Sequence, residues 1–281
     1  MNLESLPPVR EIAERHGLLA RKSLGQHFLF DLNVTRKIAR LAGPLDGQRV
    51  MEVGPGPGGL TRALLEEGAH VIAVETDARF LPVLEELAEA APGRLEIVQA
   101  DALTVDARTL ALDAIVSNLP YNVGTPLLVD WLTAEPPPAR ALTLMFQKEV
   151  AQRIVAPPST KKADGKDYGR LAVLAAARAR AQIVMQVPAR AFVPPPKVDS
   201  AVVRLDMLPE GERFMDVKAL ETVTRAAFAQ RRKTIRNGLS SAGDAAALLE
   251  AAGIDPAARP ETVPPEGFMA LARAWRAANP A

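Results

Sequence analysis

From Arg49 to Phe146, short apolar runs alternate with longer segments that have helical spacing. The runs predict buried strands at residues 50–53, 71–75, 95–98, 114–116 and 142–146. The segments between them predict helices at residues 60–67, 80–91 and 125–132. This alternation is typical of a parallel sheet with helices on both faces, so we expect an α/β fold.

The rest of the chain divides at one point. Helical spacing predicts helices at 8–19 and 31–41, and strands are expected at 181–187 and 201–205. Residues 171–178 fit either a helix or a strand, and the polar segment 157–167 is expected to be a loop. From Val217 onward the pattern is helical, so we expect a domain at 1–208 and a smaller helical domain at 209–281.

The composition excludes several classes of protein. The 281 residues include no Cys and three scattered His, at positions 16, 27 and 70, so no thiol nucleophile is possible and no metal site is expected. An apolar fraction of 48% indicates a globular chain. No run approaches the length of a membrane span and no targeting segment is visible at the N-terminus, so we expect a cytoplasmic protein without a membrane partner.

Basic residues are unevenly distributed, although 34 Lys and Arg nearly balance 33 Asp and Glu. One cluster lies near the start of the chain, at Arg21, Lys22, Arg36, Lys37 and Arg40. The other lies near its end, at Arg225, Arg231, Arg232, Lys233 and Arg236. Two local patches of this kind are compatible with binding a polyanion, in spite of a net charge of only +1.

A glycine-rich segment follows the first predicted strand. Residues 52–61 read EVGPGPGGLT, and glycines at such a strand-to-helix turn bring the backbone close to a ligand. Gly54, Gly56 and Gly59 also match the dinucleotide pattern G-x-G-x-x-G, which is weak when it stands alone. Leu60 stands where a P-loop requires Lys, so a P-loop is excluded, whereas a glycine turn without a ligand remains an alternative.

Polar residues follow the next three predicted strands. Glu75 can accept hydrogen bonds from a ribose, which NAD and S-adenosylmethionine both carry. Asp101 can accept from the amine of a bound adenine or can cap the turn that follows. The tetrapeptide Asn118-Leu119-Pro120-Tyr121 joins an amide, a constrained turn and an aromatic ring. Because the carboxyl ends of parallel strands meet at one edge, these motifs should line one crevice.

The order of these motifs resembles the class I S-adenosylmethionine-dependent methyltransferases that modify the N6 amine of adenine. The further segments GQHFL at 25–29, FVPPPKVDSAVVR at 192–204 and FAQRRKTIRN at 228–237 resemble the ribosomal RNA adenine dimethyltransferases, most closely those that act on the small subunit. The resemblance runs from about Arg21 to the C-terminal helices. It implies a Rossmann-like class I methyltransferase sheet followed by an all-helical domain that binds RNA or the ribosome.

The resemblance also implies the roles of individual residues. S-adenosylmethionine would be bound by His27, Leu29, Gly54, Gly56, Glu75, Asp101 and Asn118. His27 stands where family members usually carry Asn, and the loop at 157–167 is longer than is usual in the family.

The same resemblance implies how the target amine is held. The Asn118 side chain and a carbonyl of the Leu119–Pro120 turn would accept hydrogen bonds from it, and Leu119 would leave room for a monomethylated amine. Tyr121 and Phe192 would hold the two faces of a flipped adenine, with core packing as the alternative for Phe192.

Helical spacing suggests an RNA-binding surface on a helix expected at 220–239. At about 100° per residue, Arg225, Arg232 and Arg236 fall within about 40° of one another, with Lys233 beside them. Arg231 falls among the apolar positions, where we expect it to pair with an acid or to contact the N-terminal domain. The ridge suits phosphates, and an ordinary solvated helix face is the alternative.

The preferred hypothesis is a monomeric enzyme that transfers methyl groups from S-adenosylmethionine to N6 of two adjacent adenosines. The target would lie in a hairpin near the 3′ end of small-subunit (16S) rRNA within a pre-30S particle, with a role in ribosome biogenesis. The alternatives are a large-subunit dimethyltransferase of the macrolide-resistance type, an NAD-dependent oxidoreductase and a non-catalytic assembly factor. An oxidoreductase would leave residues 118–121 without a role.

Overall fold

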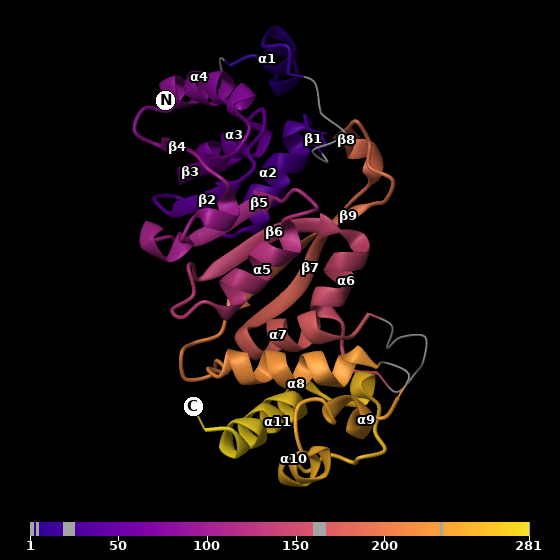
Figure 1. Ribbon diagram of the computed structural model, residues 1–281. Helices are drawn as coiled ribbons and strands as arrows, with labels where there is room; N and C mark the ends of the chain where they lie inside the picture. Colours follow the sequence, from indigo (N-terminus) through magenta and orange to yellow (C-terminus); the bar gives the residue numbers. More distant parts are fainter. Residues whose placement is uncertain (1–2, 4–5, 19–25, 160–166, 231–232, 281) are drawn as a thin grey trace. The chain divides into compact units, whose positions relative to one another are not determined.

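The computed structural model describes residues 3, 6–18, 26–159, 167–230 and 233–280 (Figure 1). The chain forms two compact units, a sheet unit at Met1–Ala151 and Gln182–Met207, and a helical unit at Gln152–Ala181 and Leu208–Ala281. The predicted division after residue 208 differs from this one, because the segment 152–181 packs with the C-terminal helices. Within the described residues, no helix has both the length and the apolar character needed to cross a membrane.

The sheet unit contains a sheet whose strands run in the order β4-β3-β2-β5-β6-β9-β7. Its strands are β2 (Arg49–Val53), β3 (His70–Glu75), β4 (Leu95–Gln99), β5 (Ala114–Asn118), β6 (Ala141–Gln147), β7 (Ala179–Val187) and β9 (Ser200–Met207). The strands from β4 to β6 are parallel to their neighbours, and β9 is antiparallel to β6. The predicted α/β fold and each predicted strand are confirmed.

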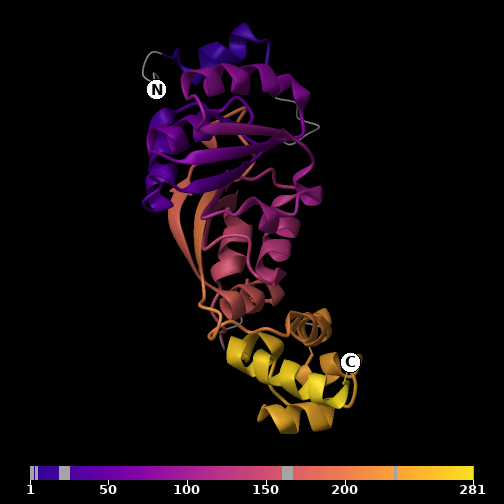
Figure 2. The same ribbon diagram turned by 90° about the vertical axis from the view of Figure 1, so that its left-hand side faces the viewer.

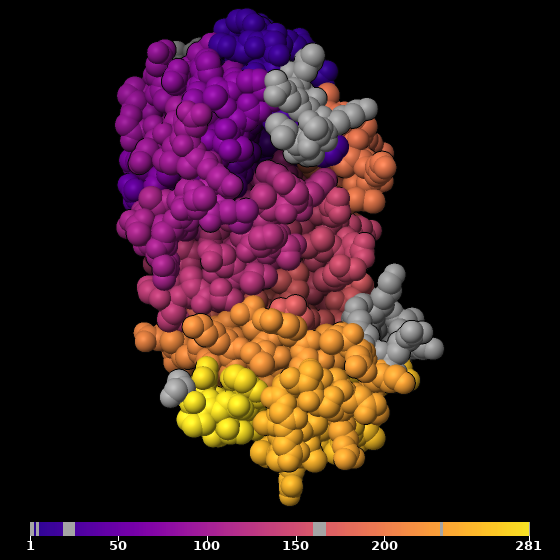
Figure 3. All heavy atoms as spheres, in the orientation of Figure 1, coloured from indigo at the N-terminus to yellow at the C-terminus, as the bar shows by residue number. Residues whose placement is uncertain are grey.

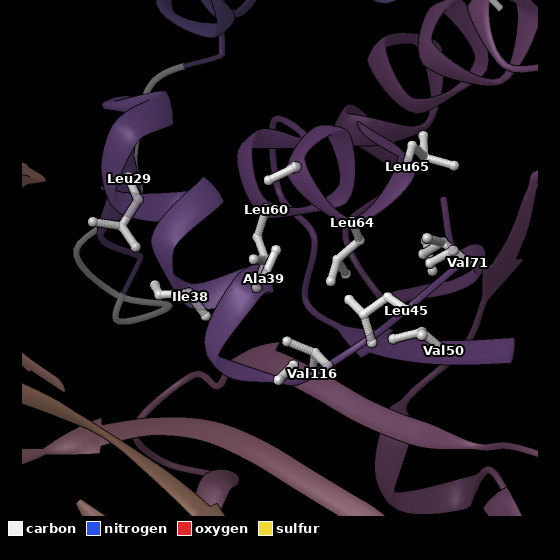
Figure 4. Packing of buried hydrophobic residues seen from close by; sticks show 14 of the residues in the cluster. Leu29, Ile38, Ala39, Leu45, Val50, Leu60, Leu64, Leu65, Val71 and Val116 are labelled. Carbon is white, nitrogen blue, oxygen red and sulfur yellow. The ribbon is translucent and has the colours of Figure 1, made fainter. Parts of the chain in front are cut away.

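Helices of the sheet unit connect and cover these strands. They are α1 (Val9–Arg15), α2 (Leu32–Leu41), α3 (Gly59–Glu66), α4 (Leu81–Ala90) and α5 (Gly124–Thr133), and α6 (Lys148–Val155) follows β6. Figure 4 shows Ile38 of α2 and Leu64 of α3 packed over Val50 and Val116 of the sheet. The continuous apolar runs of β2 and β5 therefore reflect strands in the interior of the sheet.

Three short elements escaped prediction. Strand β1 (Phe28–Leu29) pairs antiparallel with β8 (Phe192–Val193), and both are only two residues long. Helix α6 was not predicted either. Strands β1 and β8 are too short to show any periodicity in a sequence, whereas α6, with eight residues, is as long as the predicted α3 and was missed.

The helical unit is built from α7 (Arg170–Arg178), α8 (Val217–Ala229), α9 (Ile235–Leu239), α10 (Ala245–Ala252) and α11 (Pro265–Ala278). Segment 171–178, which fitted either a helix or a strand, is helical, and Val173 of α7 is buried with Leu220 of α8 and Phe268 of α11. Figure 2 shows these helices from a second side. Their shared apolar core is the reason that α7 belongs to this unit.

The prediction of one helix at 220–239 is wrong. Helix α8 ends at Ala229 and α9 begins at Ile235, with Gln230 in a non-helical conformation between them (φ −124°, ψ 61°). A Cβ on Gly238 would lie 2.9 Å from the Ala226 and Ala227 carbonyl oxygens, so α9 packs back directly onto α8. This packing, rather than a continuous helix, buries Ile235.

Two of the predicted segments are only partly described. Residues 160–166 of the predicted loop lie outside the described residues, while residues 156–159 have no regular structure and Ser159 N–H donates to the Glu261 carbonyl at 3.0 Å. Arg231 and Arg232 also lie outside the described residues, so the partner expected for Arg231 and the place of Arg232 in the ridge are not described. The surface that α8 to α11 contribute to the helical unit is orange and yellow in Figure 3.

Candidate active site

The carboxyl ends of the parallel strands surround a cavity of about 250 Å³. Residues that follow β2, β3, β4 and β5 line it, together with the segment 26–29. Every residue predicted to hold the cofactor is among them, namely His27, Leu29, Gly54, Gly56, Glu75, Asp101 and Asn118. The prediction that these motifs line one crevice thus agrees with the structure, in which they surround one cavity.

The glycine-rich turn brings the backbone to the edge of this cavity. Gly54, Gly56 and Gly58 have φ angles of 67°, 54° and 80°, which side chains strongly disfavour. A Cβ on Gly59, the first residue of α3, would lie 2.6 Å from the Leu29 carbonyl oxygen. The turn is therefore closed against the neighbouring segment 26–29, and glycine is required at these positions for conformation and for space.

Glu75 is held by the backbone on both of its carboxylate oxygens. Gly56 N–H donates to Oε2 at 3.1 Å and Asp77 N–H donates to Oε1 at 2.8 Å. Burial raises the pKa of Glu75, although these hydrogen bonds act in the opposite direction. A carboxylate has about four acceptor positions, so a fixed Glu75 can still accept hydrogen bonds from a ligand.

A second acid, Glu52, lies at the bottom of the same turn and is 1% exposed. Thr61 Oγ1 donates to its Oε2 at 2.6 Å. Burial raises the pKa of Glu52 to about 8, against the lowering effect of the Thr61 hydrogen bond. Glu52 was not among the predicted site residues, and its place near the end of the buried strand β2 was the available signal that it faces the cavity.

Two further cavity residues, Gln26 and Asp77, were not predicted. Gln26 Nε2 donates to Asp77 Oδ2 at 3.2 Å, and Arg79 Nε donates to Asp77 Oδ1 at 2.9 Å. The Arg79 hydrogen bond lowers the pKa of Asp77 to about 2. Asp77 follows Glu75 by two residues, and this spacing from a strand end was the available signal.

The position of Asp101 is compatible with both roles expected for it, as an acceptor for a bound adenine amine and as a cap for the following turn. Its Oδ1 accepts the Leu103 N–H at 3.0 Å and so caps a short turn at Ala102–Thr104. The residue is exposed, and it also lines the cavity. Capping uses one of its oxygens and leaves the other available to a ligand.

The tetrapeptide 118–121 lies beside the glycine turn. Val53 N–H donates to Ser117 Oγ at 2.9 Å, which fixes the end of β5 against the end of β2. The Pro120 carbonyl accepts the Val123 and Gly124 N–H groups at 3.1 and 3.0 Å, so it is already used by the turn that enters α5. The Leu119 carbonyl is therefore a better candidate than the Pro120 carbonyl for accepting a hydrogen bond from the target amine.

Tyr121 and His27 form one wall of the cavity. Their ring centroids are 5.8 Å apart with an interplanar angle of 35°. The Tyr121 hydroxyl is hydrogen-bonded to Ser200 Oγ at 2.9 Å, and burial raises the pKa of Tyr121. His27 Nδ1 lies 2.7 Å from the Pro194 carbonyl oxygen and must donate to it, because a carbonyl only accepts.

Phe192 does not face the cavity. It is 2% exposed, pairs with Leu29 across β1 and β8, and packs in the same core as Val202 of β9. The expectation that Phe192 stacks on the target adenine opposite Tyr121 is therefore not supported by this structure. Phe192 instead packs in the core, which was the alternative expected for it, because the pairing of β1 with β8 directs its ring into the interior.

The described residues of the two basic clusters differ in their partners, while Arg21 and Lys22 of the first cluster lie outside the described residues. Arg36 Nε donates to Glu66 Oε2 at 2.6 Å, and Arg40 Nε donates to Glu67 Oε1 at 3.0 Å. In the helical unit, Arg225, Lys233 and Arg236 are exposed, and no ion pair joins them to another described residue. Within the described part of the chain, no group of three or more His, Asp or Glu could hold a metal ion.

Comparison with known proteins shows a family match over most of the chain. Residues 17–275 match the model of the family described as ribosomal RNA adenine dimethylase. The protein "Ribosomal RNA small subunit methyltransferase A" of Phenylobacterium zucineum is 61% identical over 99% of this chain and 95% of its own length. The protein of the same name from Maricaulis maris is 54% identical, over 99% and 98%.

Solved structures show the same fold. A dimethyladenosine transferase from Plasmodium falciparum superposes with a TM-score of 0.75 at 24% identity, over 87% of this chain and 96% of that one. The 23S rRNA methyltransferase ErmE superposes with a TM-score of 0.63 at 28% identity, over 88% and 98%. With the sequence matches and the geometry of the cavity, these comparisons show that the chain belongs to the ribosomal RNA adenine dimethylase family.

Proposed function

We propose that this family member dimethylates N6 of two adjacent adenosines in a hairpin near the 3′ end of small-subunit (16S) rRNA. The small subunit is favoured because the chain is 54–61% identical, over nearly its whole length, to proteins named as small-subunit methyltransferases. The large-subunit enzyme ErmE shares the fold at only 28% identity. The macrolide-resistance alternative is therefore the weaker one.

The cavity fits S-adenosylmethionine, the methyl donor of this enzyme class. Its described lining includes the carboxyl groups of Glu75, Asp77 and Asp101, besides that of Glu52, which keeps its proton to about pH 8, and it includes no Lys or Arg. Such a lining suits a cationic ligand and disfavours the pyrophosphate of NAD, which argues against an oxidoreductase. When bound, the cofactor supplies a methyl group activated by a positively charged sulfur.

We assign the contacts with the cofactor to residues that the structure holds in place. Glu75 accepts hydrogen bonds from the ribose hydroxyls, Asp101 accepts from the adenine amine, and the backbone at Gly54 and Gly56 allows close approach. His27 and Leu29 close the cavity from the side of β1. The Nδ1 of His27 is engaged with Pro194, so Nε2 is the atom through which His27 can contact the cofactor.

The target amine is a poor nucleophile, because its lone pair is delocalised into the adenine ring. We assign its two hydrogen-bond acceptors to the Asn118 side-chain oxygen and the Leu119 carbonyl. In the first transfer both N–H groups are accepted, and in the second the one remaining N–H is accepted; each arrangement favours a pyramidal nitrogen whose lone pair is directed at the methyl group. As the N–CH₃ bond forms, the S–CH₃ bond breaks, the sulfur leaves as a neutral thioether, and the N–H proton is released to solvent. Positioning and electrostatics then carry an in-line transfer without a strong base.

The adenine must leave its stack to reach these acceptors, and Tyr121 offers one face against which it can stack. Stacking on an aromatic side chain is worth about 1–3 kcal/mol per base, which offsets much of the cost of flipping. Leu119 is 2% exposed, and we assign to its side chain the shape of the pocket around the methylated amine.

We assign RNA binding to the helical unit, through the phosphate contacts of Arg225, Lys233 and Arg236. Arg232 belongs to the same proposal by its place in the sequence. The remaining parts of the proposal are that a monomer acts in the cytoplasm on a pre-30S particle and that methylation accompanies ribosome biogenesis.

The experiment that tests the function offers labelled S-adenosylmethionine with undermethylated small subunits, large subunits or naked RNA, and then maps the labelled bases. Dimethyladenosine at two adjacent positions of 16S rRNA is expected. Label confined to the large subunit would establish the macrolide-resistance alternative instead. Cofactor binding without label on any RNA would identify a non-catalytic assembly factor.

A further inference from the structure

The ring of Tyr121 is held at both of its ends. Its hydroxyl is hydrogen-bonded to Ser200 Oγ at 2.9 Å, and its ring lies 5.8 Å from that of His27. Without such contacts, an aromatic ring that lines a cavity can rotate about its side-chain bonds, and a base that stacks on it would have to order it. Two contacts from separate segments remove that freedom in advance.

Ser200 is itself rigidly placed. It is fully buried (0% exposed), it is the first residue of β9, and it pairs with Gln147 at the end of β6. The preceding residue, Asp199, is held twice, because its carbonyl accepts the Lys148 N–H and its Oδ1 accepts the Ala189 N–H, both at 2.9 Å. The Ser200 hydroxyl therefore presents a fixed partner to the phenol.

The second contact depends on the same segment. His27 donates through Nδ1 to the carbonyl of Pro194, which lies between β8 and β9. The residues from Phe192 to Ser200 thus hold Tyr121 directly through Ser200 and indirectly through His27. The segment FVPPPKVDS at 192–200 can therefore support the site by holding Tyr121, although Phe192 itself does not face the cavity.

We propose that Ser200 is a positioning residue for methyl transfer, whose buried hydroxyl fixes the Tyr121 ring as the surface on which the target adenine stacks. The inference rests on the proposed function, which gives Tyr121 that role. Ser200 does not line the cavity, so it acts only through Tyr121. A misplacement of about 1 Å in a reacting group can lower a rate by about 10²-fold, so the orientation of this ring affects turnover.

The kinetic test compares Ser200→Ala, Tyr121→Phe and the double variant in single-turnover methylation of undermethylated small subunits. Each single variant should lower the rate about 10-fold while the Kd for S-adenosylmethionine stays within twofold. The double variant should lose no more than either single one, because both remove the same hydrogen bond. The matched control is Thr143→Val, which removes a buried hydroxyl of β6 outside the cavity and should keep the wild-type rate.

A spectroscopic test follows the ring itself. The chain contains two tyrosines, so tyrosine labelled with carbon-13 gives one set of ring signals from Tyr121 and one from Tyr168. Ser200→Ala should shift the Tyr121 signals and leave those of Tyr168, which lies in the helical unit, unchanged. An additive double variant, or Tyr121 signals that do not move in Ser200→Ala, would overturn the inference.

Tyr121→Ala separates this inference from the function on which it rests. Full methylation by Tyr121→Ala would remove the stacking role from the proposed function. Loss of methylation in Tyr121→Ala together with a wild-type rate in Ser200→Ala would overturn the positioning role alone.

Discussion

The cavity of the sheet unit and the basic residues of the helical unit differ in how their side chains are held. In the cavity, Glu52, Glu75 and Tyr121 each have a hydrogen-bond partner within the protein. On the helical unit, Arg225 and Arg236 are exposed, and no ion pair joins them to another described residue. The first arrangement suits one small ligand in one orientation, whereas the second suits a polyanion that makes many weak contacts.

This difference predicts how each region responds to substitution. A preorganised cavity should lose much of its function with a single change, because each group has one position and one task. Exposed cations should contribute small and roughly additive amounts, because each neutralises about one phosphate.

The largest effect is expected from Asn118→Ala. Removing one preorganised polar group that acts on the reacting atom costs on the order of 10²-fold or more in rate. Single-turnover methylation should show this loss, while calorimetric titration with S-adenosylmethionine should show a Kd within a few-fold of wild type. A turnover equal to that of wild type would exclude Asn118 from the clamp.

Glu75→Gln should weaken cofactor binding about 10-fold to 100-fold, because hydrogen bonds to a charged group are worth about 1.5–3 kcal/mol. The amide must also place an NH₂ group against the N–H of Gly56 or Asp77. The Kd can be measured by calorimetry. The control is Glu85→Gln, which changes an exposed acid of α4 outside the cavity and should leave the Kd unchanged. An equal loss of cofactor affinity in the two variants would contradict the role of Glu75 in binding the ribose.

The joint replacement of Arg225, Lys233 and Arg236 by Ala should weaken RNA binding and lower the dependence of log K on log salt by about 2. The control replaces Arg36, Lys37 and Arg40, which removes the same charge from α2, where Glu66 and Glu67 already bind the two arginines. Binding curves at several salt concentrations measure both slopes. Equal changes would mean that net charge alone matters.

The smallest effect is expected in the pH dependence of stability. The folded protein keeps the proton of Glu52 to about pH 8, whereas an ordinary Glu loses it near 4.5. Between these values only the folded state holds the proton, so the free energy of unfolding falls as the pH rises. Glu52→Gln should remove this fall, and the difference from wild type should exceed about 1 kcal/mol between pH 5 and 8, since one pKa unit is worth about 1.4 kcal/mol.

Denaturant unfolding at several pH values measures this difference. The exposed Glu85→Gln on α4 serves as the control and should follow the wild-type curve. Parallel curves for wild type and Glu52→Gln would show that Glu52 ionises normally in the folded protein.

The strands and the cavity were predictable because their signals are local. Buried parallel strands are continuous apolar runs, and Gly54, Gly56 and Gly58 adopt positive φ angles that other residues avoid. Once the order of strands and helices was recognised, the convergence of Glu75, Asp101 and Asn118 followed from the geometry of a parallel sheet.

The break between α8 and α9 and the direction of Phe192 could not be predicted from the sequence, because both depend on contacts between distant residues. No Gly or Pro separates Ala229 from Ile235, so helical spacing alone continues through the point where α8 ends. The break is stabilised by Gly238 against Ala226 and by the Ile235 N–H, which donates to the Ala258 carbonyl at 2.8 Å. The direction of Phe192 likewise depends on the pairing of β1 with β8.

Gly59 has a consequence for how this gene can vary. Every missense change at its codon adds a Cβ, which would stand 2.6 Å from the backbone oxygen of Leu29. Leu29 is paired with Phe192, so a new side chain at position 59 would displace both the strand at the cavity and the segment that leads to Ser200. A genetic screen should therefore recover codon 59 as a source of null alleles, because this one position lies where three distant parts of the chain meet.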